Sequence, residues 1–241
     1  GGVPVPIYPP GRPSQIEEHL RRHAGIVTNC LGAVLITVPE AKRFGGLLRS
    51  QVETLGSVVT VDELTARAGL FVAPKIGAGE VAFLQYTSGS TGSPKGVVLT
   101  HANLLANIRA MGKALEIKSR DVFVSWLPLY HDMGLIGAWL GNLYYANLLV
   151  IMSPLAFLSK PERWLWAIHR ARGTVSAAPN FAFELCLRRI DDNALEGLDL
   201  SSWRLALNGA EAISPETMQR FTERFGPYGF GANTMMPVYG L

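Results

Sequence analysis

Strand-length apolar runs alternate with helix-like stretches along most of this chain. Near the start, the apolar run 33–38 is followed by a helix-like stretch at 40–55 and a second apolar run at 57–61. The alternation resumes at 121–129 and continues to 236–240. Parallel strands need this order, because a parallel pair is joined by a crossover connection, usually a helix. The pattern predicts an α/β fold with mainly parallel β-sheets flanked by helices.

The second half of the chain gives this alternation in detail. Helices are expected at 133–145, 161–171, 181–190 and 214–225, the last with Pro215 at its first position. The apolar runs between them are expected to be strands, at 121–129, 148–152, 174–179, 203–209 and 236–240.

The N-terminal region combines a proline-rich entry with one helix. Ser14 is expected as the N-cap of a helix over 14–24, with Glu17 completing a capping box. His19 and His23 lie four residues apart on this helix and could bind a metal. No third ligand lies near them in the sequence and arginines precede His23, so we expect a solvated helical face.

Charge and cysteine content exclude several classes of protein. The 241 residues carry 22 Lys and Arg against 19 Asp and Glu, with no block of like charges, so nucleic acid is not expected as a partner. Cys30 and Cys186 are far apart, which is typical of packed thiols in a reducing compartment. No signal peptide is visible, and we expect a cytoplasmic protein.

One uncharged stretch raises the question of a membrane span. Residues 133–159 contain no Asp, Glu, Lys or Arg and are long enough to cross a bilayer. Asn142, Asn147 and Pro154 interrupt the stretch. We therefore expect a buried helix, a turn at Ala146 and Asn147, and a short strand, with no transmembrane span.

The run "YTSGSTGSPKGV", residues 86–97, has the composition of a phosphate-binding loop. Its backbone N–H groups and hydroxyls can converge on phosphate oxygens, and Lys95 adds a positive charge. It is not the P-loop of kinases and GTPases, because Pro94 precedes the lysine, Gly96 follows it, and strands are expected on both sides. A plain polar hairpin connection stays open as the alternative.

Four segments in order resemble the adenylate-forming superfamily, which includes acyl-CoA synthetases, luciferases and adenylation domains of peptide synthetases. They are "YTSGSTGSPKGV", "SWLPLYHDMGLIG", "LNGAE" and "PVYGL". Within the superfamily, "GGVPVPIYPP", "MSPLAFLSKPERWLWAIHR" and "SAAPNFAFELC" are most similar to the fatty acyl-AMP ligases. The resemblance implies that residues 1–241 form part of an N-terminal adenylation domain, with a possible subdomain boundary near 67–80 and the C-terminal catalytic domain absent.

The resemblance also implies a reaction. A medium- or long-chain fatty acid would be activated with ATP to acyl-AMP, with release of pyrophosphate, and passed to an acyl carrier protein. Two alternatives stay open: coenzyme A as the acceptor, or an adenylation-like binding module without turnover. The main Mg²⁺ ligand is expected just beyond Leu241, and this piece alone is expected to turn over negligibly.

Site residues follow from the same motifs. Lys95 would hold the β- and γ-phosphates together with Thr87, Ser88, Gly89, Ser90, Thr91 and Gly92, and Thr91 could contact Mg²⁺ indirectly. The adenine segment would comprise Asn208, Gly209, Ala210 and Glu211, with Tyr239 stacking on the base and Gly240 beside it.

His131 resembles the family's gate residue near the reacting carboxylate, and with Lys95 it is the expected catalytic residue; a structural histidine is the alternative. Asp132 would orient its ring or bind a loop amide. Met133, Ile136 and Phe181 would contact the acyl chain, in a tunnel whose depth also depends on Trp139 and Phe183.

Overall fold

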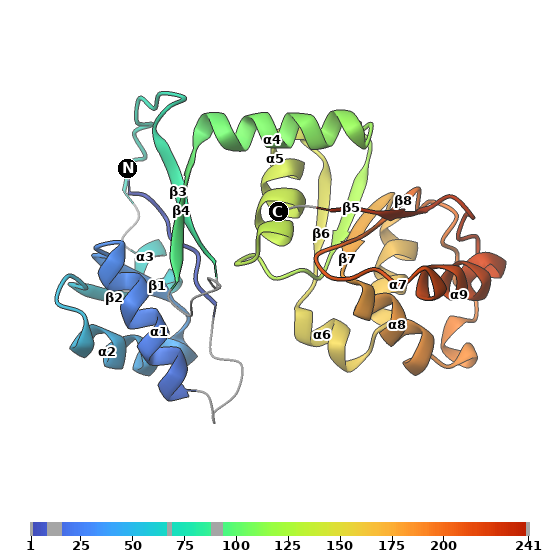
Figure 1. The fold of residues 1–241 in the computed structure, drawn as a ribbon, viewed down its shortest axis with the longest axis horizontal. Helices are drawn as coiled ribbons and strands as arrows, with labels where there is room; N and C mark the ends of the chain where they lie inside the picture. The colour runs from blue at the N-terminus through green and yellow to red at the C-terminus, as the bar shows by residue number, and fades with distance from the viewer. Residues whose placement is uncertain (1, 9–15, 67–68, 88–93, 240–241) are drawn as a thin grey trace. The chain divides into compact units, whose positions relative to one another are not determined.

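The computed structural model describes residues 2–8, 16–66, 69–87 and 94–239. These residues group into two compact units, 1–105 and 106–241, which divide within one helix. The stretch 67–80, near which a boundary was expected, lies inside the first unit. Figure 1 shows the elements of both units, and each unit is described by itself.

The first unit begins with a small α/β layer. Its elements are α1 (Ile16–Asn29), β1 (Val34–Thr37), α2 (Lys42–Gln51), β2 (Ser57–Thr60) and α3 (Val61–Thr65). Strands β1 and β2 are parallel, with Val34 opposite Ser57, which confirms the predicted parallel pair. A small apolar cluster of Val27, Leu48, Val52 and Leu55 holds this layer together.

The histidine pair on α1 is buried, so the predicted solvated face was wrong. His23 is fully buried and His19 is 7% exposed, with ring centroids 3.8 Å apart. Tyr8 packs edge-on against both rings, and Phe44 of α2 lies 5.1 Å from the His19 ring. The expected N-cap, Ser14, lies outside the described residues.

An antiparallel hairpin and the first turn of a long helix complete the first unit. The hairpin pairs β3 (Val81–Thr87) with β4 (Lys95–Thr100), as predicted for the two sides of the Gly/Ser-rich loop. Helix α4 (His101–Ala114) was not predicted. It begins at a reciprocal cap, in which Thr100 Oγ1 accepts the Asn103 N–H and Asn103 Oδ1 accepts the Thr100 N–H.

The second unit is built on a five-stranded parallel sheet. The strands lie in the order β6 (Leu148–Ile151), β5 (Val122–Ser125), β7 (Val175–Ala178), β8 (Leu205–Asn208) and β9 (Met235–Pro237). All neighbouring pairs are parallel, which confirms the predicted fold class. The helices between them are α5 (Gly141–Tyr145), α6 (Pro154–Ser159), α7 (Glu162–Ala171), α8 (Asn180–Arg189) and α9 (Pro215–Phe225).

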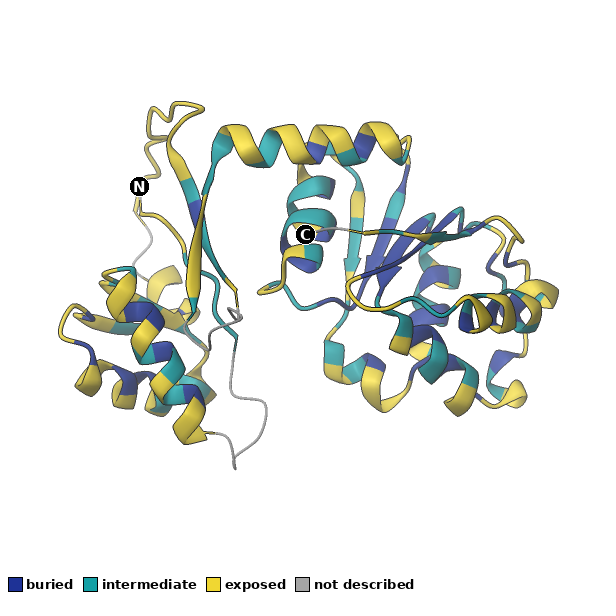
Figure 2. Ribbon diagram, in the orientation of Figure 1, coloured by how far each residue is buried: buried dark blue, intermediate teal, exposed yellow. Residues whose placement is uncertain are grey.

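The core of the second unit lies on the central strands and the helix faces that cover them. Every residue of β7 and β8 is buried, as expected of a parallel sheet covered on both faces. Figure 2 shows the buried residues concentrated on these central strands. Large aromatic side chains fill the space around them, among them the fully buried Trp164, Phe183 and Phe221.

The uncharged stretch 133–159 forms three helical pieces and one strand, the last helix being α6. The helix expected over 133–145 is present: Met133–Leu140 is a π-helix that continues into α5. Ala146, at φ 54°, ends α5 before β6 begins, so the predicted turn is confirmed. Within the part of the chain that the structure describes, no helix is both long and apolar enough to cross a membrane.

An ion pair secures the amino-terminal edge of this sheet. The Arg204 guanidinium donates to both carboxylate oxygens of Asp121, at 2.9 and 2.7 Å, and the Thr174 hydroxyl donates to the same carboxylate. Burial alone would raise the pKa of Asp121, but these hydrogen bonds and one from the Lys118 N–H outweigh it and lower the pKa to about 2. The strands β5, β7 and β8 are thereby tied together where they begin.

Candidate active site

The topology of the five-stranded sheet marks one edge as a ligand site. From β5 the chain crosses to β6 on one side, whereas from β7 it continues through β8 to β9 on the other. In such sheets, ligands bind outside the carboxyl ends of the strands at this switch point. Predicted site residues lie at or after the ends of four strands at this edge: His131, Asp132, Phe181, Asn208, Gly209, Ala210, Glu211 and Tyr239.

The loop after β5 is a tight turn that presents His131. The His131 N–H bonds the Pro128 carbonyl at 3.2 Å, and the His131 carbonyl accepts the Leu135 N–H at 2.7 Å. Gly134 lies within this turn, and a Cβ atom there would stand 2.2 Å from the Pro128 oxygen. Only glycine fits this close approach, which fixes how the chain passes from β5 into the π-helix.

His131 and Asp132 form a half-exposed ion pair. His131 Nδ1 lies 2.6 Å from Asp132 Oδ1, and the same oxygen accepts the Met133 N–H at 2.7 Å. Asp132 therefore contacts both the His131 ring and the backbone amide of Met133. The bond from Asp132 raises the pKa of His131 against the opposing effect of burial, and the same bond lowers the pKa of Asp132. The proton is held on Nδ1, so Nε2 is the ring nitrogen left for a ligand.

The residues expected to contact an acyl chain differ in accessibility. Met133 and Ile136 are half-buried at the start of the π-helix, and Trp139 is 45% exposed. Phe181, in the first turn of α8, is 44% exposed, and its ring meets Trp126 edge-on at 6.0 Å. Phe183 is fully buried against Trp164 and Phe221. It belongs to the core of the unit.

The segment after β8 runs against the end of β9. The Val238 N–H donates to the Asn208 carbonyl at 2.8 Å, and a Cβ atom at Gly209 would lie 2.6 Å from the Val238 carbonyl oxygen. Glycine is therefore required at 209. The next residue, Ala210, has φ 70°, a left-handed conformation that is uncommon for a residue with a side chain.

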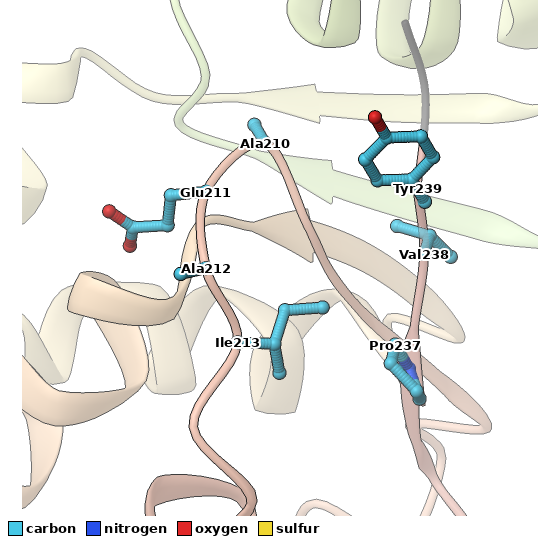
Figure 3. A pocket seen from close by; sticks show the side chains of 7 residues that line it. All are labelled: Ala210, Glu211, Ala212, Ile213, Pro237, Val238 and Tyr239. Atoms are coloured by element: carbon cyan, nitrogen blue, oxygen red, sulfur yellow. The ribbon is translucent and has the colours of Figure 1, made fainter.

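A pocket of about 460 Å³ opens between these two segments. Figure 3 shows the Tyr239 ring on one side and the 210–213 loop on the other. Tyr239 is 88% exposed, so its ring face is free to stack on a flat group. The pocket is lined by Ala210, Glu211, Ala212, Ile213, Pro237, Val238 and Tyr239.

Polar side chains connect the 208–214 segment to the start of α8. Glu211 Oε1 accepts the Phe181 N–H at 2.6 Å. Asn180 Oδ1 accepts from Asn208 Nδ2 at 3.2 Å and from the Ser214 N–H at 3.1 Å. Asn180 was not predicted as a site residue. Its position two residues after β7, at the same sheet edge as Asn208, is the signal that could have identified it.

Trp126 is a second residue that the sequence interpretation missed. It directly follows β5, is 4% exposed, and stacks on Phe157 at 4.1 Å. Its Nε1 is buried and bonds no other residue in the described ranges.

The phosphate-loop residues belong to the first unit. Thr87 and Lys95 face each other across the end of the β3–β4 hairpin, and both are exposed. Ser88, Gly89, Ser90, Thr91 and Gly92 lie outside the described residues, as does Gly240 in the second unit. Among the residues described, no three His, Cys, Asp or Glu side chains are placed to hold a metal ion. We therefore assign no Mg²⁺ ligand to them.

Comparison with known proteins agrees with this geometry. A family model described as AMP-binding enzyme matches residues 1–241. The medium-chain fatty acid–acyl carrier protein ligase JamA of Moorena producens is 38% identical over 245 residues, which cover 100% of this chain and 41% of JamA. TtuA of Teredinibacter turnerae, a ligase of the same description, is 46% identical over 171 residues, 71% of this chain and 27% of TtuA.

A solved structure matches across both units. The fatty acyl-adenylate ligase from L. pneumophila, in complex with acyl adenylate and pyrophosphate, has 36% identity and a TM-score of 0.85. The match covers 99% of this chain and 41% of that protein. The chain thus spans less than half the length of each of these three proteins.

Proposed function

The chain belongs to the AMP-binding enzyme family, and we propose that it forms the nucleotide- and acyl-binding part of a fatty acyl-AMP ligase. The predicted resemblance to that group is confirmed by the relatives and the solved structure above. The observation that carries the proposal is the alignment of His131, Phe181, Asn208–Glu211 and Tyr239 along the carboxyl edge of one parallel sheet.

In the proposed reaction, a carboxylate oxygen of a medium- or long-chain fatty acid attacks the α-phosphorus of ATP. The bond between the α-phosphorus and the bridging oxygen breaks, and pyrophosphate leaves. Mg²⁺, when bound, would offset the negative charge on the phosphates. Adenine would lie in the 210–239 pocket against Tyr239, and Lys95 with the Thr87–Gly92 loop would hold the β- and γ-phosphates. Catalysis would then come from positioning and from stabilising charge, without a covalent enzyme intermediate.

His131 is proposed as the residue beside the reacting carboxylate. With its proton held on Nδ1 by Asp132, its Nε2 would face the acid, and its raised pKa favours the protonated form that attracts a carboxylate. Met133, Ile136 and Phe181 would contact the first carbons of the chain. Phe181 is an exposed apolar residue, and a bound lipid tail would cover such a side chain.

The second half of the proposed reaction transfers the acyl group. The thiol of an acyl carrier protein would attack the acyl carbonyl, and AMP would leave. JamA and TtuA support the choice of a carrier protein, because their names state an acyl carrier protein as acceptor.

The test is to incubate the protein in its full-length form with ATP, Mg²⁺ and dodecanoic acid, and to detect dodecanoyl-AMP by mass spectrometry. A carrier protein bearing its phosphopantetheine arm and coenzyme A are then offered in separate reactions. We expect acyl-AMP from the wild type, little from Lys95→Ala or His131→Ala, and transfer to the carrier protein. Absence of dodecanoyl-AMP would refute the proposed ligase activity. Transfer to coenzyme A alone would refute the proposal that an acyl carrier protein is the acceptor.

A further inference from the structure

The start of helix α8 lacks a cap of its own. Its N-cap residue, Pro179, makes no side-chain hydrogen bond to the helix. The first N–H groups of a helix have no partner within the helix and need one elsewhere. The Glu211 carboxylate supplies it by accepting the Phe181 N–H at 2.6 Å, although the two residues lie 30 positions apart in the sequence. The loop after β8 therefore caps the helix that follows β7.

The backbone at Ala210 directs Glu211 toward this helix. Ala210 takes the left-handed conformation at φ 70°, which costs free energy for a residue with a side chain. Figure 3 shows the Glu211 carboxylate pointing away from Tyr239 and the pocket. Glu211 is thus one of the residues that line the pocket, while its carboxylate accepts a hydrogen bond from α8.

Phe181 connects this bond to the proposed acyl site. Its ring is 44% exposed and meets the buried Trp126 edge-on, at 6.0 Å between centroids. Trp126 is held in turn by its stacking on Phe157. Packing against Trp126 therefore holds the Phe181 ring, and the hydrogen bond to Glu211 holds the Phe181 backbone.

A second tie runs parallel to the first. Asn180 Oδ1 accepts from both Asn208 and the Ser214 N–H, so two consecutive residues of α8 are joined to the nucleotide segment. A displacement of the 208–214 segment when a nucleotide binds would consequently move the first turn of α8.

We propose that Glu211 is a positioning residue that sets the place of Phe181 in the acyl site and couples that wall to the nucleotide segment. This inference rests on the proposed function, and it replaces a direct contact between the Glu211 side chain and adenine. A glutamate that contacted the base would affect AMP and acyl-AMP alike, whereas a glutamate that positions Phe181 affects only ligands with an acyl chain.

The test is a set of calorimetric titrations of the protein with AMP and with a non-hydrolysable dodecanoyl-adenylate mimic. We expect Glu211→Ala to weaken binding of the mimic about tenfold, the scale of one lost hydrogen bond to a charged group, and to change AMP binding less than about twofold. Glu211→Gln retains an acceptor oxygen and should restore most of the affinity. Glu216→Ala, a glutamate on the exposed first turn of α9, is the matched control.

A double variant tests the path through Phe181. Phe181→Leu should weaken binding of the mimic and leave AMP binding unchanged. Adding Glu211→Ala to this variant should reduce mimic binding less than Glu211→Ala does in the wild type, because both changes act on the same side of the acyl site. If Glu211→Ala fails to fold, the Glu211→Gln and Phe181→Leu single variants still test the inference.

Three results would overturn the inference. Equal losses of AMP and mimic binding would place the carboxylate on the nucleotide. If the losses of mimic affinity in the two single variants added fully in the double variant, or if Glu211→Ala left mimic binding unchanged, the bond from Glu211 to Phe181 would not contribute to ligand binding. If the wild-type protein bound neither probe, the proposed function would fail together with this inference, and that outcome differs from the other two.

Discussion

Gly134 lies so close to Pro128 that a Cβ atom on it would stand 2.2 Å from the Pro128 carbonyl oxygen. Because that oxygen is backbone, Gly134→Ala must displace the turn that carries His131. We expect it to reduce the free energy of unfolding by about 2–3 kcal/mol. Gly137→Ala, in the same π-helix but with open space around it, is the matched control. Equal thermal unfolding midpoints for the two variants would contradict the packing described here.

The His131–Asp132 pair makes a prediction about protonation. Because the bond from Asp132 raises the pKa of His131, Asp132→Asn should lower that pKa toward its ordinary value of 6.5. The pair stabilises the protein while His131 is protonated, and this contribution is lost as the pH rises through the raised pKa. A proton NMR titration of the His131 ring measures the change, with Asp191→Asn as the control. An unchanged pKa in Asp132→Asn would contradict the pairing.

The buried histidines of α1 predict sensitivity to acid. Burial, then the neighbouring His23, lowers the pKa of His19 from 6.5 to about 4, and burial also lowers the pKa of His23. Both histidines are neutral in the folded protein. Their contribution to the free energy of unfolding is therefore fully present above pH 6.5 and is lost as the pH falls toward 4. Full protonation of His19 alone would lower the free energy of unfolding by about 3 kcal/mol.

Chemical denaturation between pH 7 and pH 4 tests this prediction. A double variant with His19→Gln and His23→Gln should show a much flatter dependence of the unfolding free energy on pH. His101→Gln, which alters a histidine outside this pair, should keep the wild-type slope. The same slope in all three proteins would show that the pair is not the acid-sensitive element.

The fold was predictable because it follows from local patterns. Buried parallel strands require continuous apolar runs, and the helix beginning at Pro215 has its cap residue Ser214 in the sequence. The burial of His19 and His23 was not predictable, because Tyr8 and Phe44 cover them from other segments. The π-helix depends on the contact between Gly134 and Pro128, which no periodicity reveals.

The motifs point to residues of the candidate site but not to the contacts that these residues make. Glu211 belongs to the segment expected to hold adenine, and in the structure it lines the same pocket as Tyr239. Its hydrogen bond to Phe181, however, depends on the adjacency of β7 and β8 and on the left-handed backbone of Ala210. Both are tertiary properties that a single sequence does not carry.

The ion pair between Arg204 and Asp121, at the amino-terminal edge of the sheet, is predicted to stabilise the second unit. Arg204→Ala would leave the Asp121 carboxylate, whose side chain is 6% exposed, without its main partner. We expect a loss of about 3 kcal/mol of stability at pH 7. Arg172→Ala, which removes an arginine from a largely exposed pair with Asp199, should cost far less. Urea unfolding of both variants distinguishes them, and similar losses would contradict the importance of the buried pair.

The central claim is that the carboxyl edge of β8 and β9 forms the adenylate pocket. Gly209→Ala tests it most directly, because the added Cβ would lie 2.6 Å from the Val238 carbonyl oxygen and would push the Tyr239 segment away. Gly226→Ala, with nothing within 4 Å, is the control. The decisive measurement is calorimetric titration of both variants and the wild type with the dodecanoyl-adenylate mimic. We predict tight binding to the wild type and to Gly226→Ala and a loss of at least about tenfold in Gly209→Ala; equal binding to all three would contradict the claim.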